Sequence, residues 1–167
     1  PGPASDIPIR IYWPRAAQAA ELLPVLVWFH GGGFVIGDLD THDSACRLLA
    51  NRADCMVVAV DYRLAPEHKF PAGLEDAVAS FRWLAAEAID LGIDPDRIVV
   101  AGDSAGGTLA TVVAQTVRGE ARTPCLQWLI YPATDLAADT ASHSSCGEGF
   151  LLTREDMEWM RSLYLND

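Results

Sequence analysis

Residues 97–107, Arg-Ile-Val-Val-Ala-Gly-Asp-Ser-Ala-Gly-Gly, place Ser104 at a tight turn between two regular elements. The β-branched, apolar start of this stretch is typical of a buried strand. From Thr108 to Arg118 apolar residues recur at helical spacing. A strand, Gly-x-Ser-x-Gly and a helix, in this order, are the context of a nucleophile elbow. The stretch therefore predicts an α/β fold with Ser104 as a candidate nucleophile, set at a helix N-terminus that favours a developing oxyanion. The motif alone leaves a second interpretation open, in which the glycine-rich loop merely joins strand to helix.

A second glycine-rich loop, His30-Gly31-Gly32-Gly33-Phe34, follows an apolar strand predicted at residues 23–29. Consecutive glycines let the main chain approach a substrate closely, and fixed N–H donors stabilise an oxyanion without reorganisation. A phosphate-binding loop would need Gly-x-x-x-x-Gly-Lys-Ser/Thr or a Gly-x-Gly-x-x-Gly that opens a helix, and neither is present here. The loop resembles the His-Gly-Gly-Gly loop that supplies oxyanion-hole donors in esterases and lipases, and this resemblance implies Gly32, Gly33 and the N–H of Ala105 as the donors. A flexible glycine hinge is the alternative.

A third motif, Asp-Tyr-Arg-Leu-Ala-Pro-Glu-His, occupies residues 61–68. Together with His-Gly-Gly-Gly-Phe-Val-Ile-Gly-Asp at 30–38 and Gly-Asp-Ser-Ala-Gly-Gly at 102–107, it resembles the hormone-sensitive-lipase family of α/β-hydrolase carboxylesterases. Residues 131–132 and 149–153 fit the same pattern. The resemblance implies a mostly parallel sheet flanked by helices. It also implies hydrolysis of carboxylic esters with short to medium acyl chains, through an acyl-serine intermediate. The alternative within this fold is a non-catalytic binding protein like the plant gibberellin receptors.

The composition of the chain limits the classes of molecule that it is expected to bind. The chain has 167 residues, half of them hydrophobic, a net charge of −11 and Lys69 as its single lysine, which argues against nucleic acid or an anionic membrane surface as a partner. Its four cysteines and four histidines show no metal-ligand spacing, so we expect no metal and no cofactor. No apolar run is long enough to cross a bilayer. We expect a cytoplasmic enzyme that takes a small-molecule ester, and assembly into a homo-oligomer is compatible with the sequence.

Strands alternate with helices along the chain, which predicts one mostly parallel sheet. The domain organisation expected is an N-terminal part of the hydrolase core at 1–140, followed by a loop and helix at 141–167 that lead into a cap by resemblance. Thr41 is a plausible N-cap, and Thr153 with Asp156 forms a capping box. The predicted strands are 7–13, 23–29, 55–61, 97–102 and 125–131, the predicted helices 41–52, 72–90, 105–118 and 154–165, and the predicted loops 14–22 and 133–149.

A serine nucleophile needs a base that a carboxylate orients. His143 is the only histidine after Ser104, and Asp135 and Asp139 precede it. We reject a triad of Ser104, Asp135 and His143, because no strand separates the last two and the family resemblance places both partners after two further strands. The chain is therefore expected to be a fragment that ends before those strands, with both partners beyond Asp167. The isolated polypeptide is then expected to be inactive.

Other polar residues are assigned structural roles. His30 is expected to hold the glycine loop through hydrogen bonds, and Asp103 to order the loop beside Ser104. His42 is interpreted as an exposed polar residue near a helix start. Arg63 and Glu67 are predicted to share a salt-bridge network.

Overall fold

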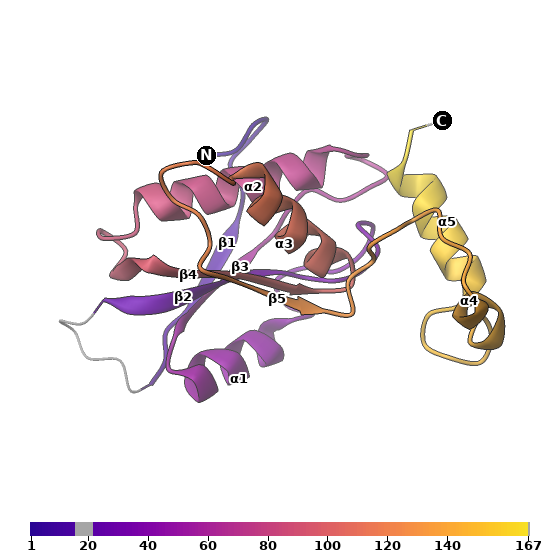
Figure 1. Ribbon diagram of the computed structural model, residues 1–167, viewed down its shortest axis with the longest axis horizontal. Coiled ribbons are helices and arrows are strands. Elements are labelled where there is room, and N and C mark those ends of the chain that lie inside the picture. Colours follow the sequence, from indigo (N-terminus) through magenta and orange to yellow (C-terminus); the bar gives the residue numbers. More distant parts are fainter. Residues whose placement is uncertain (16–21, 167) are drawn as a thin grey trace.

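A computed structural model describes residues 1–15 and 22–166. Within these residues, five strands form one sheet in the order β1-β3-β2-β4-β5 (Figure 1). β1 pairs with β3 in antiparallel orientation, and the other three pairings are parallel, which confirms the predicted sheet. The strands are β1 (Ile9–Tyr12), β2 (Leu23–Phe29), β3 (Met56–Val60), β4 (Ile93–Asp103) and β5 (Leu126–Ile130). The helices are α1 (Asp43–Ala53), α2 (Ala72–Ala86), α3 (Ala105–Thr116), α4 (Ala141–Ser145) and α5 (Arg154–Tyr164).

The sheet separates two hydrophobic layers. α1 covers one face, and α2 and α3 cover the other (Figure 1). Side chains alternate between the faces of a strand. On β2, Val27 and Phe29 accordingly join the core under α2 and α3, whereas Leu26 and Trp28 join the core under α1. The sequences of β2, β3 and the second half of β4, residues 98–102, are accordingly nearly continuous apolar runs, because both faces of these segments are largely buried.

One edge of the sheet is far less covered. β5 pairs with β4, and its outer side has no partner strand among the described residues. Leu126, Trp128 and Leu129 on this strand expose 58%, 41% and 36% of their surface. β5 therefore combines unpaired backbone groups with exposed apolar side chains.

Several helices and strands begin at other residues than predicted, because of local hydrogen bonds and strand pairing. α1 begins at Asp43 with His42 as its N-cap, not at Thr41, because the Thr41 hydroxyl is engaged with the backbone of Asp38. β4 begins at Ile93, earlier than predicted, because Ile93 pairs with Leu23 before a register shift. A capping box between Thr140 and His143 starts the one-turn helix α4 inside the predicted loop 133–149. The predicted loop at 14–22 lies largely outside the described residues.

A largely buried ion pair joins Arg63, in the loop after β3, to Asp76 of α2. The backbone N–H and Nε of Arg63 donate to Asp76 Oδ2 at 3.0 and 2.8 Å, and Nη2 donates to Oδ1 at 2.8 Å. Asp76 is 1% exposed. Glu75 lies 3.6 Å from the same guanidinium. The prediction that Glu67 pairs with Arg63 was wrong. The first turns of α2 pack against Arg63, so its acidic partners are Glu75 and Asp76 of this helix.

Replacing Asp76 with alanine should lower the free energy of unfolding by about 3 kcal/mol, because the largely buried Arg63 guanidinium loses its hydrogen-bonded counter-charge and keeps only the half-exposed Glu75 at 3.6 Å. Urea denaturation followed by circular dichroism measures this loss. Asp96→Ala is the matched control, because Asp96 pairs with Arg122 at 2.6 Å while its side chain is 83% exposed. An exposed pair contributes about 0–1 kcal/mol. Equal losses in the two variants would contradict the structural role assigned to Asp76.

None of the helices in the described part of the chain has the length and apolar character needed to span a membrane.

Candidate active site

Ser104 sits between β4 and α3 with φ +52° and ψ −118°. This region is costly for a residue with a side chain and persists where the surroundings enforce it. The Ser104 N–H donates to Ile130 O at 2.8 Å, which ties the turn to the neighbouring strand. A Cβ on Gly102 or Gly106 would collide with the carbonyl of Phe29 at the end of β2. The two glycines therefore let three chain segments meet at the turn, as a strand–turn–helix elbow requires.

The glycine loop after β2 presents free backbone donors. Gly32 and Gly33 have φ +124° and +61°. Gly32 O accepts from the N–H groups of Val35 and Ile36, both at 3.0 Å, which curls the loop. Within residues 1–15 and 22–166, the N–H groups of Gly32, Gly33 and Ala105 donate to no protein acceptor. These are the three groups predicted as oxyanion donors, and unpaired donors of this kind are what an oxyanion hole needs.

Asp103 connects this loop to the nucleophile turn. Its Oδ1 accepts from the Gly31 N–H at 3.0 Å, and His42 Nε2 lies 3.3 Å from the same oxygen. Burial disfavours the charged carboxylate, but the contacts with His42 and Gly31 outweigh it and hold the pKa of Asp103 below its ordinary value. The prediction that His42 is an exposed residue was wrong. Its side chain is 23% exposed and packs beside Trp28 and His30, with ring centroids 6.4 and 5.7 Å away.

His30 is buried at the start of the glycine loop and helps to hold this loop in place. It is 2% exposed and stacks on Tyr62 with a centroid distance of 4.4 Å. Its Nδ1 lies 2.7 Å from Gly31 O, and the Tyr62 hydroxyl donates to His30 O at 2.6 Å. Burial lowers the pKa of His30, which keeps the ring neutral near pH 7. A neutral, stacked imidazole is suited to holding the loop.

The rejected triad is not assembled in the described part of the chain. His143 Nδ1 accepts from the Thr140 N–H at 3.1 Å in the cap of α4, and Asp135 Oδ1 accepts from Ala137 N–H at 2.9 Å. The Ser104 hydroxyl has no hydrogen-bond partner among the described residues, while Ser104 itself remains half-buried. α4 and α5 lie beside the sheet and not on either of its faces (Figure 1).

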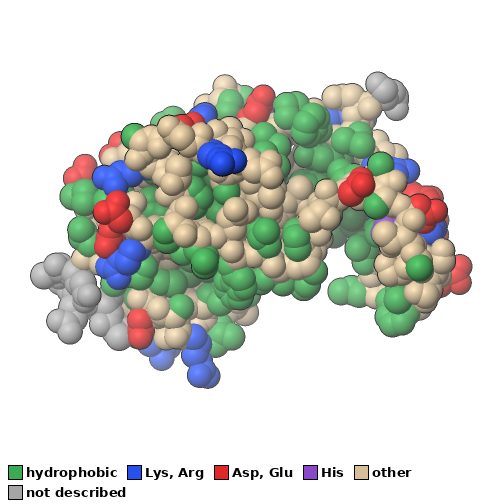
Figure 2. All heavy atoms as spheres, viewed as in Figure 1, with side chains coloured by type: hydrophobic (Ala, Val, Ile, Leu, Met, Phe, Trp, Pro, Cys, Tyr) green, Lys and Arg blue, Asp and Glu red, His purple; other side chains and the backbone are tan. Residues whose placement is uncertain are grey.

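α5 approaches the glycine loop from that side. Tyr164 stacks on Phe34 with a centroid distance of 4.1 Å. Lys69 Nζ donates to Leu165 O at 3.0 Å, and the N–H of Phe70 donates to Tyr164 O at 2.9 Å. A Cβ on Gly33 would strike Met160 Sδ. Hydrophobic side chains border the hollow between the sheet and the α4–α5 end of the molecule (Figure 2). Sequence reasoning missed Met160, because helical periodicity does not say which neighbour a helix face meets.

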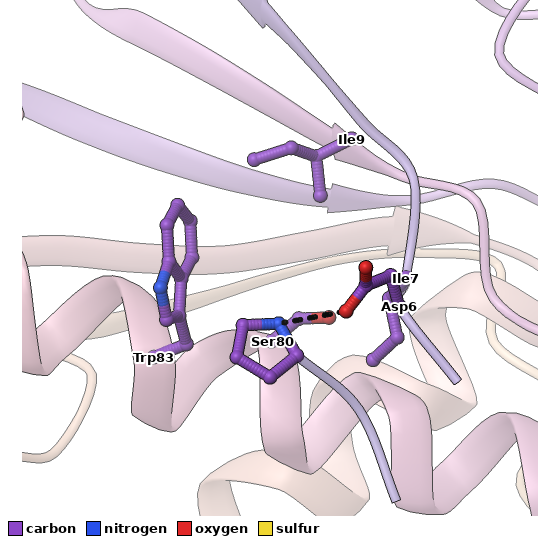
Figure 3. A pocket seen from close by; sticks show the side chains of 6 residues that line it. Asp6, Ile7, Ile9, Ser80 and Trp83 are labelled. Atoms are coloured by element: carbon purple, nitrogen blue, oxygen red, sulfur yellow. Dashed lines mark ion pairs between the residues drawn. The ribbon is translucent and has the colours of Figure 1, made fainter. Parts of the chain in front are cut away.

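A separate cavity of about 300 Å³ lies between the N-terminal segment and α2 (Figure 3). It is lined by Pro1, Asp6, Ile7, Ile9, Ser80 and Trp83. None of the residues of the elbow or the glycine loop borders it. The candidate site is therefore defined by the loops at the carboxyl ends of β2 and β4, where open α/β sheets bind ligands.

Known proteins are similar in sequence to this chain over nearly all of its length. A family described as an alpha/beta hydrolase fold matches residues 26–167. The carboxylic ester hydrolase LipN of Mycobacterium tuberculosis is 51% identical over an alignment 173 residues long, which covers 100% of this chain and 45% of that protein. An ethyl acetate hydrolase of Pseudomonas putida is 42% identical over 160 residues, covering 95% of this chain and 50% of that protein. The chain spans about half the length of the curated relatives it matches.

Solved structures agree with the fold. An ester hydrolase from the metagenome of Lake Arreo, complexed with a derivative of bipyridine phosphonate, superposes with a TM-score of 0.95 at 49% identity, covering 100% of this chain and 53% of that one. A hyperthermophilic esterase from the archaeon Pyrobaculum calidifontis gives a TM-score of 0.94 at 45% identity, covering 100% of this chain and 55% of that one. With the three motifs in place on the expected loops, the chain belongs to the hormone-sensitive-lipase family of α/β-hydrolases.

Proposed function

We propose that the protein containing this chain is a serine hydrolase that cleaves carboxylic esters through an acyl-serine intermediate. The observation that carries the proposal is the position of Ser104: its turn also carries the N–H of Ala105, and Asp103 beside it is bonded to the loop of Gly32 and Gly33. Among the described residues, the Ser104 hydroxyl and these three N–H groups have no protein hydrogen-bond partner. Relatives named as ester hydrolases add independent support.

In the proposed reaction, Ser104 Oγ attacks the ester carbonyl carbon and its proton passes to a general base. The carbonyl π electrons move onto oxygen, and the three backbone N–H groups stabilise the resulting oxyanion. The intermediate collapses, breaks the carbon–oxygen bond to the alcohol and leaves an acyl group on Ser104, and the alkoxide takes the proton back from the base. Water then gives a proton to the same base and bonds to the acyl carbon, the bond from that carbon to Ser104 Oγ breaks, and the base returns the proton to Oγ, which releases the acid and restores the serine. Because neither His143 nor Asp135 contacts Ser104, we place the base and its carboxylate partner in polypeptide beyond Asp167.

We further propose that residues 141–167 start a cap over an acyl pocket, next to the core formed by residues 1–140. Met160 against Gly33 and Tyr164 against Phe34 support this assignment, because they place side chains of α5 against the glycine loop. A preference for short to medium acyl chains is what the family resemblance implies, and a relative named as an ethyl acetate hydrolase supports it.

Both proposals can be tested by steady-state kinetics with the full natural polypeptide that contains residues 1–167. The substrates are p-nitrophenyl acetate, butyrate, octanoate and palmitate. We expect turnover of the three shorter esters and a steep fall in kcat/KM for palmitate. Saturable binding of the esters without any turnover would favour the non-catalytic, receptor-like alternative. A maximum at palmitate would leave the serine mechanism intact and contradict the proposed acyl-chain preference.

The isolated polypeptide 1–167 should hydrolyse none of these esters, because without a contacting base Ser104 is a weakly nucleophilic hydroxyl at neutral pH. It should also self-associate through the exposed edge of β5. An ester hydrolysis assay, at the concentration at which the full polypeptide is active, tests the first expectation. Light scattering measures self-association. Turnover by residues 1–167 that His143→Ala abolishes would show that the triad rejected above does operate.

A further inference from the structure

His42 lies where three segments of the candidate site meet. Its Nε2 is 3.3 Å from Asp103 Oδ1, and that same oxygen accepts from the Gly31 N–H at 3.0 Å. Asp103 directly precedes Ser104, and Gly31 directly precedes Gly32. A single carboxylate oxygen thus links the nucleophile turn to the first residue of the glycine loop, and His42 contacts that oxygen from a third segment.

The ring of His42 has a defined polar role at this point. A carboxylate only accepts hydrogen bonds, so His42 can donate to Asp103 only with a proton on Nε2. Nδ1, on the other side of the ring, lies 3.1 Å from Thr41 Oγ1. Removing the Nε2 proton donor would leave the 16% exposed Asp103 carboxylate with backbone N–H groups alone as its hydrogen-bond donors among the described residues.

The loop that carries His42 is itself held in place. Thr41 and Asp38 bond each other, with the Asp38 N–H donating to Thr41 Oγ1 at 2.9 Å and the Thr41 N–H donating to Asp38 Oδ1 at 2.8 Å. Arg10 on β1 donates to Leu39 O at 3.0 Å and pairs with Asp40 at 2.8 Å. His42 is therefore presented to Asp103 by a preorganised loop, which is the kind of support that a precisely aligned site needs.

We propose that His42 is a positioning residue for the reaction: by contacting Asp103, it fixes the glycine loop at Gly31 in register with the nucleophile turn, so that the proposed oxyanion donors and Ser104 keep their relative placement. The proposal rests on the proposed function. The placement matters because a shift of about 1 Å between reacting groups can reduce turnover by about 100-fold.

Two variants of the full natural polypeptide separate the polar contact from simple packing. His42→Phe keeps an aromatic ring beside Trp28 and His30 but removes the donor. His42→Gln removes the ring but places an amide N–H near the position of Nε2. With p-nitrophenyl butyrate as the substrate, we expect His42→Phe to lower kcat by about 10- to 100-fold with little change in KM, and His42→Gln to retain most of kcat. The opposite order, with Phe active and Gln impaired, would show that His42 acts by packing and would overturn the proposal.

A double-mutant cycle tests whether His42 acts through Asp103. Asp103→Ala should lower kcat by itself, and adding His42→Phe to it should cause no further loss, because the two changes remove one shared contact. Independent, multiplicative losses in the double variant would contradict action through Asp103. Thermal unfolding of all variants shows whether each is folded.

Hydrogen–deuterium exchange of the Gly31 amide gives a readout that does not depend on activity. We expect faster exchange in His42→Phe than in the wild type or His42→Gln. If the wild type hydrolyses no ester while Gly31 exchange still rises in His42→Phe, the proposed function fails and the structural link stands. If the wild type is active and His42→Phe matches it in kcat and in Gly31 exchange, the link is wrong and the proposed function stands.

Discussion

Ser104→Ala is expected to reduce hydrolysis of p-nitrophenyl butyrate by the full natural polypeptide by roughly 10⁶-fold in kcat, the scale on which serine hydrolases lose activity when the nucleophile is removed. The residual rate would come from the oxyanion donors and substrate binding alone. Initial rates at saturating substrate measure the effect. The fold should survive, because the turn is fixed by backbone contacts such as Ser104 N–H to Ile130 O and by the close approach of Gly106 to β2.

Ser80→Ala is the matched control for this experiment. Ser80 is buried in α2, and its hydroxyl has no hydrogen-bond partner among the described residues. Losing that hydroxyl removes no contact in the candidate site, so kcat should stay at the wild-type value. Substantial turnover by Ser104→Ala, with Ser80→Ala also active, would show that another residue is the nucleophile.

Gly33→Val should lower kcat by about 100- to 1000-fold, the cost of losing one oxyanion-hole donor. Gly33 has φ +61°, which a β-branched residue adopts at high cost, and its Cβ would meet Met160 Sδ. Both effects would turn the Gly33 N–H away from the substrate carbonyl. Paired measurements of kcat and KM locate the loss, because an interaction made only in the transition state affects kcat.

Gly119→Val controls for the backbone conformation alone. Gly119 follows α3 with φ +89°, and a Cβ there would meet no atom within 4 Å. We expect this variant to lose stability but keep kcat. Unchanged kcat with a raised KM in Gly33→Val would place Gly33 in the substrate pocket and outside the oxyanion hole.

The fold could be predicted from the sequence where local chemistry and packing agree. The apolar run at 23–29 became β2 with the same bounds, because a strand buried on both faces needs an uninterrupted apolar sequence. The elbow at Ser104 was predictable because its glycines are required by the contact with Phe29. The capping box of Thr153 and Asp156 begins α5 as predicted, because its hydrogen bonds are local to the sequence.

Contacts between distant segments could not be predicted in the same way. The pairing of His42 with Asp103 joins residues 61 positions apart, and it arises because α1 begins near the point where β4 ends. Asp76 replaced Glu67 as the partner of Arg63 for a similar reason: a helix packed against the loop supplies a closer acid than the loop itself. A single sequence carries no pattern that identifies such partners.

The identity of the nucleophile is the central claim, and the site of a covalent adduct tests it most directly. The full natural polypeptide, treated with an alkyl fluorophosphonate and digested, should show by tandem mass spectrometry one phosphonyl group per chain on Ser104. Ser104→Ala should take up none, and ester hydrolysis by the wild type should fall in proportion to labelling. Stoichiometric labelling at any other residue, or full activity in a fully labelled protein, would contradict the account.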